Sequence, residues 1–215
     1  MVLCSILITP GCQVKLYFNK TSPFSRKVRV LVCELKLESI QHIDTGLISP
    51  VMPNEAVIAV NPVGKVPVLV LDDGQSLTDS RVICEFVDSL GSGAFFPRGP
   101  DARFRSLHLQ ALADDILNTA VATRYELAHR PGELIWGVWV EMQKLRMSRT
   151  IDYFNRVVET FVETPTIGEV AVGCVLGYID FRELDVSWRE RNPHLSAWFD
   201  QFDRRDSMKL TRPGS

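Results

Sequence analysis

The sequence predicts an α/β domain followed by an all-helical domain, and three observations lead to this fold class. Short apolar runs alternate with helical stretches over residues 15–88, which is typical of α/β units. Pro97, Gly99 and Pro100 then interrupt regular structure, and the apolar periodicity after them is helical. We therefore divide the chain into an N-terminal extension (1–13), an α/β domain (14–91), a linker (92–101) and a helical domain (102–215).

Composition narrows the classes of function. The chain has 215 residues, 46% hydrophobic and 23% charged, as in an ordinary globular protein. Its 24 basic and 26 acidic residues give a formal net charge of -2, which supplies no field that would attract nucleic acid or an anionic membrane. We therefore expect a small-molecule ligand, with neither nucleic acid nor a membrane as partner.

Cysteine usage and hydropathy bear on the compartment. Five cysteines without a C-x-x-C pair fit neither a disulfide framework nor a zinc site, so we expect a reducing compartment and no metal. The apolar run from Ser5 to Ile8 lacks preceding basic residues and is shorter than the core of a secretory signal. No segment approaches the roughly 18 consecutive apolar residues of a membrane span. The expectation is a soluble, cytoplasmic protein.

The elements of the first domain follow from alternating and helical apolar patterns. They are a strand at 14–18, a polar turn at 19–24, a helix at 25–35, strands near 40–43, 66–71 and 75–77, and a helix at 80–90. The sequence Asp72-Asp73-Gly74 predicts a hairpin turn between the third and fourth strands.

Three helical segments are predicted in the second domain. One carries an apolar stripe of Leu109, Leu112, Ile116 and Leu117, and the others span 145–158 and 166–181. Thr166 and Glu169 have the spacing of a capping box, in which each side chain satisfies a free backbone N–H. The small, apolar residues that follow predict a helix buried on most sides in a bundle.

The turn after the first strand is suited to binding an anion. Ser22 lies where free backbone N–H groups and the positive end of a helix dipole converge. The same serine can simply be an N-cap, with Pro23 at the first helical position. Ser25 and Thr21 are alternatives for the anion-binding hydroxyl; we favour Ser22 because Ser25 lies three residues further along the chain.

Two further segments can contact a peptide-like ligand. Pro67 stands at the entry of the third strand, where a ladder donor is otherwise expected, and a bend there leaves the backbone of Val66 free for another peptide. Asp79 and Ser80 precede an apolar helix. They either cap it or receive an ammonium and a carboxylate.

Together these segments resemble the thioredoxin-like domain of the soluble glutathione transferases, and the order of elements from about Lys15 to Pro213 is similar to that family's. The Ser-Pro-Phe turn resembles the tau class and bacterial transferases of unassigned class, whereas the omega class has cysteine at the position of Ser22. Residues 111–116 and 177–182 resemble those bacterial forms. The resemblance implies a thioredoxin-like first domain, a helical second domain, glutathione as co-substrate, a homodimer and a role in detoxification.

The resemblance also implies roles for the three segments. Ser22 would donate a hydrogen bond to the glutathione sulfur. Val66 would pair its backbone with the cysteinyl part, with Pro67 as a cis-proline. Asp79 and Ser80 would hold the γ-glutamyl end.

Two other sets of residues complete the predicted site. Lys65 would lie near the glycyl carboxylate of glutathione, with Phe24 beside the bound molecule. The electrophile is expected between the domains, in contact with the first helix of the second domain. The candidates there are Asp115, Thr119, Thr123 and Arg124.

A serine hydroxyl and a helix N-terminus both favour the glutathione thiolate, which would attack a small hydrophobic electrophile or a peroxide. Three alternatives stay open. A glutathione-dependent isomerase, lyase or etherase would use the same site. A thiol transferase of the omega type is disfavoured by serine at position 22. A non-catalytic protein of this fold would bind ligands or partners only.

The remaining reactive or aromatic residues are expected to be structural. Cys33 and Cys84 fall on apolar helix faces, and Cys12 precedes the first strand, so none is favoured as a nucleophile. The tryptophans are expected in the core or an interface; they are Trp136, Trp139, Trp188 and Trp198.

Overall fold

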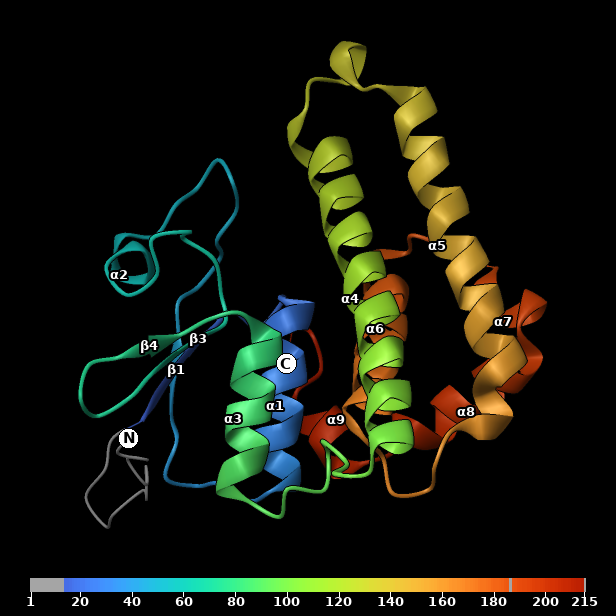
Figure 1. Cartoon of the computed structure of the whole chain (residues 1–215). Coiled ribbons are helices and arrows are strands. Elements are labelled where there is room, and N and C mark those ends of the chain that lie inside the picture. The colour runs from blue at the N-terminus through green and yellow to red at the C-terminus, as the bar shows by residue number, and fades with distance from the viewer. Residues whose placement is uncertain (1–13, 186, 215) are drawn as a thin grey trace.

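The computed structural model describes residues 14–185 and 187–214, so the predicted extension 1–13 lies outside the described part (Figure 1). The first domain is a four-stranded sheet with helices. Its elements are β1 (Lys15–Phe18), α1 (Pro23–Glu34), β2 (Gln41–Asp44), α2 (Glu55–Ile58), β3 (Val68–Val70), β4 (Ser76–Leu77) and α3 (Ser80–Leu90). The α/β domain predicted from the sequence is confirmed.

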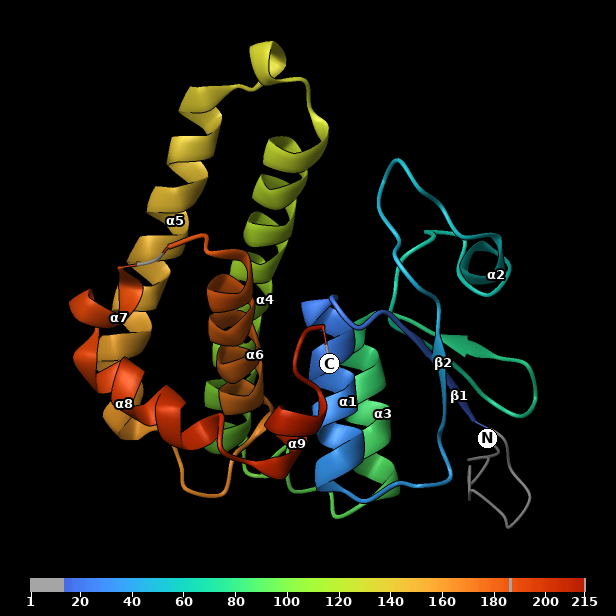
Figure 2. The same ribbon diagram turned by 180° about the vertical axis from the view of Figure 1, so that it is seen from behind.

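The sheet has the order β2-β1-β3-β4. β1 is parallel to β2 and antiparallel to β3, and β3 is antiparallel to β4. The predicted hairpin joins β3 and β4, with Gly74 at a φ of 83°, a left-handed conformation that suits glycine. α1 and α3 lie side by side between the sheet and the helical domain, where α1 packs against α6 (Figures 1 and 2).

The second domain is helical, as predicted. Its elements are α4 (Pro100–His129), the short 3-10 helix η1 (Gly132–Leu134), α5 (Gly137–Val157), a second 3-10 helix η2 (Val158–Thr160), α6 (Ile167–Arg182), α7 (Trp188–Arg191), α8 (Pro193–Phe202) and α9 (Asp206–Leu210). α4 and α5 form a long antiparallel pair, and α6 lies against α4 (Figure 2). Every residue from Ile167 to Leu176 is buried, which confirms the predicted central helix. No helix in the described residues is both long and apolar enough to cross a membrane.

Several boundaries differ from the prediction. β3 begins at Val68 and not at Val66, because Pro67 has no N–H to donate to the ladder. α4 begins at Pro100, inside the predicted linker, because proline is compatible with the first helical position. α5 begins at Gly137, well before the predicted start at residue 145, since the exposed apolar residues of its first turns hide the helical stripe.

The tryptophans, expected in the core or an interface, differ in their burial. Trp188 is 1% exposed and belongs to the core, and the ring of Trp198 stacks on Phe202. Trp136 is 66% exposed, so it is not a core residue. It is the N-cap of α5, after the turn in which the chain reverses direction between α4 and α5 (Figure 1).

The predicted capping box is present at the start of α6. The Thr166 N–H donates to Glu169 Oε2 at 2.8 Å, and Thr166 Oγ1 accepts from the Gly168 N–H at 3.3 Å. The Ser106 hydroxyl joins it from α4, donating to Thr166 Oγ1 at 2.8 Å. The central helix therefore begins in a hydrogen-bonded network that also ties it to α4.

Replacing Thr166 with valine is expected to lower the free energy of unfolding by about 1–2 kcal/mol, because the shape is kept and the cap is lost. Chemical denaturation measures this change. Thr160→Val is the matched control, since the Thr160 hydroxyl is exposed and donates only to the Val157 carbonyl. Equal stability of the two variants would show that the box does not support α6.

Candidate active site

Three segments singled out by the sequence meet at one end of the sheet. Tyr17 of β1 pairs with Val68 of the antiparallel β3, so the turn after β1 lies beside the residues before β3. Leu77 of β4 pairs with Leu69, so the residues after β4 reach the same place. α1 and α3 therefore begin side by side, and their first turns lie at the same end of the domain (Figure 1). The positive ends of two helix dipoles point toward this place.

Ser22 is the N-cap of α1 and is half-buried. Its Oγ accepts a hydrogen bond from the Ser25 N–H at 3.2 Å, and its own N–H donates to the Asn19 carbonyl at 3.1 Å. The bond to Ser25 uses a lone pair of the hydroxyl, so the hydroxyl proton can still be donated to a ligand. The first turn of α1 has no acidic residue that would offset the helix dipole.

The two alternative hydroxyls are engaged differently. Thr21 Oγ1 donates to Asn19 Oδ1 at 2.7 Å, so its proton is committed within the turn. Ser25 is completely buried, and its Oγ accepts from the Asn19 N–H at 3.5 Å. This geometry favours Ser22 as the hydroxyl that faces a ligand.

Asn19 organises this turn and was not predicted from the sequence. Its Oδ1 accepts from both the N–H and the hydroxyl of Thr21, each at 2.7 Å, and its Nδ2 donates to the Gly46 carbonyl. Asparagine directly after a strand is a known start of such turns, because its side chain bonds the backbone two residues on. The buried Asn19 thus positions the start of α1.

The bend before β3 leaves backbone groups outside the sheet ladder. The Val66–Pro67 peptide bond is cis, the conformation that the resemblance implies. Because pairing with β1 begins at Val68, the peptide groups of half-buried Val66 precede the ladder. Asn61 shapes the approach to the bend, since its Nδ2 donates to the Lys65 carbonyl at 2.8 Å. The Lys65 side chain is exposed.

Asp79 caps α3 while keeping a carboxylate oxygen near solvent. Its Oδ1 accepts from the Arg81 N–H at 2.8 Å, and its Oδ2 lies 3.3 Å from Arg81 Nη2. The Asp79 side chain is 57% exposed, whereas Ser80 at the first helical position is buried. A cation at Asp79 and an anion at the free N–H groups of α3 can therefore bind within one residue of each other.

A buried ion pair lies on the other side of Arg81. Arg81 Nε is 3.7 Å from Asp114 Oδ2, and Asp114 Oδ1 accepts from Lys27 Nζ at 2.5 Å. Burial raises the pKa of the Asp114 carboxyl, and the positive charges of Lys27 and Arg81 act against this rise. The four charged residues Asp79, Arg81, Asp114 and Lys27 thus connect the starts of α3 and α1 to α4.

The cysteines of the described residues are not placed for nucleophilic attack. Burial raises the pKa of Cys84 and of half-buried Cys33, and it raises the pKa of Cys174 to about 11. A thiol with a raised pKa holds little of the reactive thiolate at neutral pH. In the same part of the chain, no group of His, Cys, Asp and Glu residues is arranged to hold a metal ion.

The residues of α4 that were predicted to contact the electrophile differ in their burial. Thr119 and Thr123 are buried, and their hydroxyls donate to backbone carbonyls one turn earlier, at 3.0 and 2.8 Å. Both threonines therefore face the bundle interior in this structure, and their hydroxyl protons are already donated. Asp115 is exposed, and Phe24 is half-buried against the core.

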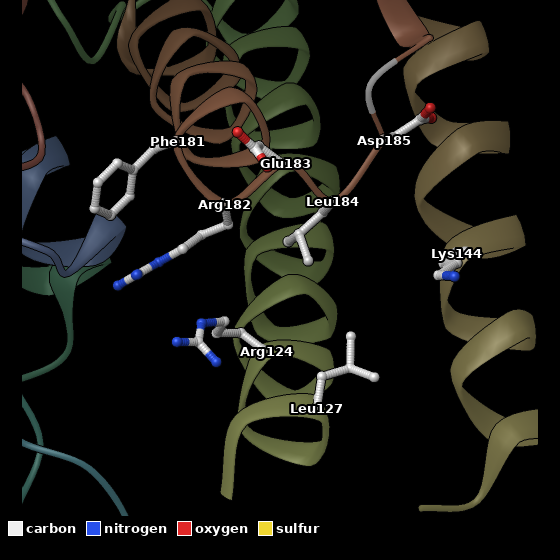
Figure 3. A pocket seen from close by; sticks show the side chains of 8 residues that line it. All are labelled: Arg124, Leu127, Lys144, Phe181, Arg182, Glu183, Leu184 and Asp185. Carbon is white, nitrogen blue, oxygen red and sulfur yellow. The ribbon is translucent and has the colours of Figure 1, made fainter. Parts of the chain in front are cut away.

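Arg124 lines an open pocket of about 700 Å³ at the end of α6 (Figure 3). α4 contributes Arg124 and Leu127, and α5 contributes Lys144. The remaining lining residues come from the end of α6 and the segment after it; they are Phe181, Arg182, Glu183, Leu184 and Asp185. Phe181 and Arg182 lie in the family-like segment 177–182, for which the sequence predicted no role in ligand binding.

Comparison with known proteins matches both domains to described families. Residues 21–90 match "Glutathione S-transferase, N-terminal domain" and residues 138–201 match "Glutathione S-transferase, C-terminal domain". An Escherichia coli (strain K12) protein, the uncharacterized GST-like protein YibF, is 30% identical over 206 residues, which cover 93% of this chain and 98% of that protein.

Solved structures agree with these matches. A glutathione transferase family member from Pseudomonas fluorescens Pf-5 with bound glutathione is 39% identical, with a TM-score of 0.90, covering 94% of this chain and all of that chain (100%). A second structure of a Pf-5 family member, with bound S-(propanoic acid)-glutathione, has a TM-score of 0.86 at 38% identity, covering 93% of this chain and 99% of the other.

Proposed function

This chain belongs to the glutathione S-transferase family, and from that premise we propose that it binds glutathione and activates its thiol for attack on small hydrophobic electrophiles or peroxides. The observation that carries the proposal is the meeting of three segments at one end of the sheet. A tripeptide with an ammonium group, two carboxylates and a thiol finds a partner for each part there. Similar proteins that were crystallised with glutathione support the choice of ligand.

The proposed binding mode follows from the charges and free backbone groups of the site. Asp79 receives the γ-glutamyl ammonium, and Ser80 with the first N–H groups of α3 receives the neighbouring carboxylate. The peptide groups of Val66 pair with the cysteinyl residue as an added strand would. The exposed Lys65 reaches the glycyl carboxylate. Phe24, half-buried at the start of α1, borders the sulfur.

In the proposed mechanism Ser22 acts as a hydrogen-bond donor and never attacks. Its hydroxyl donates to the glutathione sulfur, and the first N–H groups of α1 add a positive dipole end. Both interactions are stronger with the thiolate than with the thiol, so they lower the thiol pKa. The thiolate then forms a carbon–sulfur bond while a leaving group departs with its electron pair. With a peroxide, the sulfur bonds to one oxygen and becomes a sulfenic acid, while the other oxygen leaves with the O–O electron pair and takes a proton from solvent to give an alcohol or water.

The proposed setting is the cytoplasm, where the protein would act as a homodimer in detoxification. The family resemblance supports this setting, and the scattered cysteines agree with a reducing compartment. Light scattering tests the assembly: a mass near the 24.3 kDa of a single chain would contradict the homodimer.

Replacing Asp79 with asparagine is expected to raise the dissociation constant for glutathione about tenfold, because asparagine still caps α3 but cannot pair with an ammonium. Isothermal titration calorimetry with glutathione, and with an analogue that lacks the γ-glutamyl amino group, measures the effect. The wild type should bind the analogue more weakly than glutathione, and the variant should bind both alike. If the variant preferred glutathione over the analogue as strongly as the wild type does, Asp79 would not be the partner of the γ-glutamyl ammonium. If the wild type did not bind glutathione, the proposed function would be overturned.

A further inference from the structure

The pocket at the end of α6 combines positive charge with apolar surface. Arg124, Lys144 and Arg182 supply the cations, and Leu127, Phe181 and Leu184 supply the apolar lining. The side chains of Arg124 and Arg182 extend in the same direction, with the ring of Phe181 close to Arg182 (Figure 3). The pocket therefore offers two guanidinium groups beside an apolar wall.

Some charged residues of the pocket are paired in salt bridges, and in the part of the chain that the structure describes the two arginines are not. Asp185 is paired with Arg191 at 2.5 Å, and Lys144 is paired with Glu141 at 2.9 Å. Within residues 14–185 and 187–214, no salt bridge joins Arg124 or Arg182 to a carboxylate. The carboxylate of Glu183 points away from both arginines (Figure 3). Two arginines thus keep their positive charge available.

Aromatic rings hold Arg182 in place. Its guanidinium lies 4.3 Å from the centroid of the Phe181 ring and 5.7 Å from that of Tyr178. Its Nε is buried without a hydrogen-bond partner in the described residues. The Tyr178 hydroxyl also takes one side-chain hydrogen bond from Arg182. A guanidinium held in this way keeps its other donors for a ligand carboxylate, and little side-chain entropy is lost when that carboxylate binds.

The same end of α6 lies level with the start of α1. The guanidinium of Arg26 in α1 contacts Gly177 of α6, where a side chain would collide with it. α1 and α6 run in opposite directions (Figure 2). The residue one turn before Arg26 in α1 and the residue one turn after Gly177 in α6 therefore lie at the same level, each about 6 Å along its helix from the contact. Those positions are Ser22 and Phe181. The end of α6 that carries Phe181, and with it the pocket, therefore lies at the level of the proposed thiolate.

Resting on the proposed function, we propose that the electrophile carries a carboxylate on an apolar body, with Arg124 and Arg182 binding the carboxylate while Phe181, Leu127 and Leu184 contact the body. The reactive carbon of such a molecule points toward Ser22. Paired arginines suit a carboxylate because each can donate two parallel hydrogen bonds to its two oxygens.

Two aryl chlorides of nearly the same shape test the proposal: 4-chloro-3-nitrobenzoate, which carries a carboxylate, and 4-chloro-3-nitrobenzamide, which carries a neutral carboxamide in its place. In both reactions the glutathione sulfur bonds to the ring carbon, chloride leaves with the bonding electron pair, and the thiol proton passes to solvent. The measured quantity is the ratio of kcat/KM for the acid to kcat/KM for the amide. Taking the ratio cancels changes that affect both substrates alike.

Arg124→Gln and Arg182→Gln should each lower this ratio about tenfold. Each removes a charge-assisted hydrogen bond that only the carboxylate of the acid makes, so the reaction of the amide is affected less. Arg124→Lys should lower the ratio less. Arg130→Gln is the matched control: it removes one charge at the end of the same helix, where Arg130 pairs with Glu126 at 2.7 Å, and should leave the ratio unchanged.

Binding of the two glutathione conjugates by calorimetry gives a second measurement that needs no turnover. The wild type should bind the carboxylated conjugate more tightly than the carbamoyl conjugate, and the Arg124→Gln variant should lose this preference. The carboxylate proposal alone would be overturned if the arginine variants kept the wild-type acid-to-amide ratio and the wild type bound both conjugates equally, while glutathione still bound. Loss of all glutathione and conjugate binding by the wild type would overturn the proposed function and this inference together.

Discussion

Replacing Lys27 with methionine is expected to lower the free energy of unfolding by about 3–5 kcal/mol, the usual effect of removing one partner from a buried ion pair. Both partners are buried: the Lys27 side chain is 0% exposed, and that of Asp114 is 5% exposed. Their 2.5 Å contact joins α1 to α4. Without the ammonium, the Asp114 carboxylate would stay buried and face only the more distant Arg81.

Urea denaturation at a fixed protein concentration measures this effect. Lys144→Met is the matched control, because Lys144 pairs with Glu141 at the surface and its loss should cost less than about 1 kcal/mol. The double variant Lys27→Met with Asp114→Leu should recover much of the loss, since no unpaired charge remains buried. Equal stability of Lys27→Met and Lys144→Met would show that the buried pair contributes no more to the free energy of unfolding than the surface pair does.

Replacing Ser22 with alanine is expected to lower kcat/KM for glutathione conjugation about 100-fold at neutral pH. Loss of one preorganised donor to a developing or bound anion typically has an effect of roughly this size. The variant also loses the cap to the Ser25 N–H, which should lower the free energy of unfolding by about 1 kcal/mol. The pH profile separates the two effects, because only loss of the sulfur hydrogen bond should move the rise of activity to higher pH.

Two neighbouring hydroxyls serve as matched controls for Ser22→Ala. In Thr21→Val the bond to Asn19 Oδ1 is lost, and in Ser25→Ala the acceptor of the Asn19 N–H is lost. Both changes should affect stability more than the pH profile. A shifted pH profile in Ser25→Ala, with a normal profile in Ser22→Ala, would transfer the role to Ser25.

The parts of the fold that were predicted from sequence are those with a local cause. The hairpin after β3 depends on Gly74, and the start of α6 depends on the spacing of Thr166 and Glu169. The helix predicted at 80–90 has both an Asp79 cap and a strong apolar stripe, and α3 has the predicted bounds. By contrast, α2, α7 and α9 span four or five residues each, too few for a periodic pattern to appear.

The site was predictable to the extent that it lies next to predicted elements. Ser22, Val66 and Asp79 stand at the ends of strands or the starts of helices, where free backbone groups are expected. Lys27 and Asp114 were not predicted, since each reads as an ordinary charge on an amphipathic helix until packing buries it. Arg182 lies at the last turn of α6, where a basic residue is expected for the helix dipole alone. Only the tertiary arrangement brings it near Arg124.

The most direct test of the central claim is the pKa of the glutathione thiol when it is bound to the protein, measured from thiolate absorbance by ultraviolet difference spectroscopy. A free thiol of this kind has a pKa of about 8.5. The wild type should hold the bound thiol at a lower pKa, and Ser22→Ala should raise that pKa by about two units, equivalent to about 2.7 kcal/mol. An identical pKa in wild type and Ser22→Ala would contradict the role of Ser22 as the donor to the thiolate.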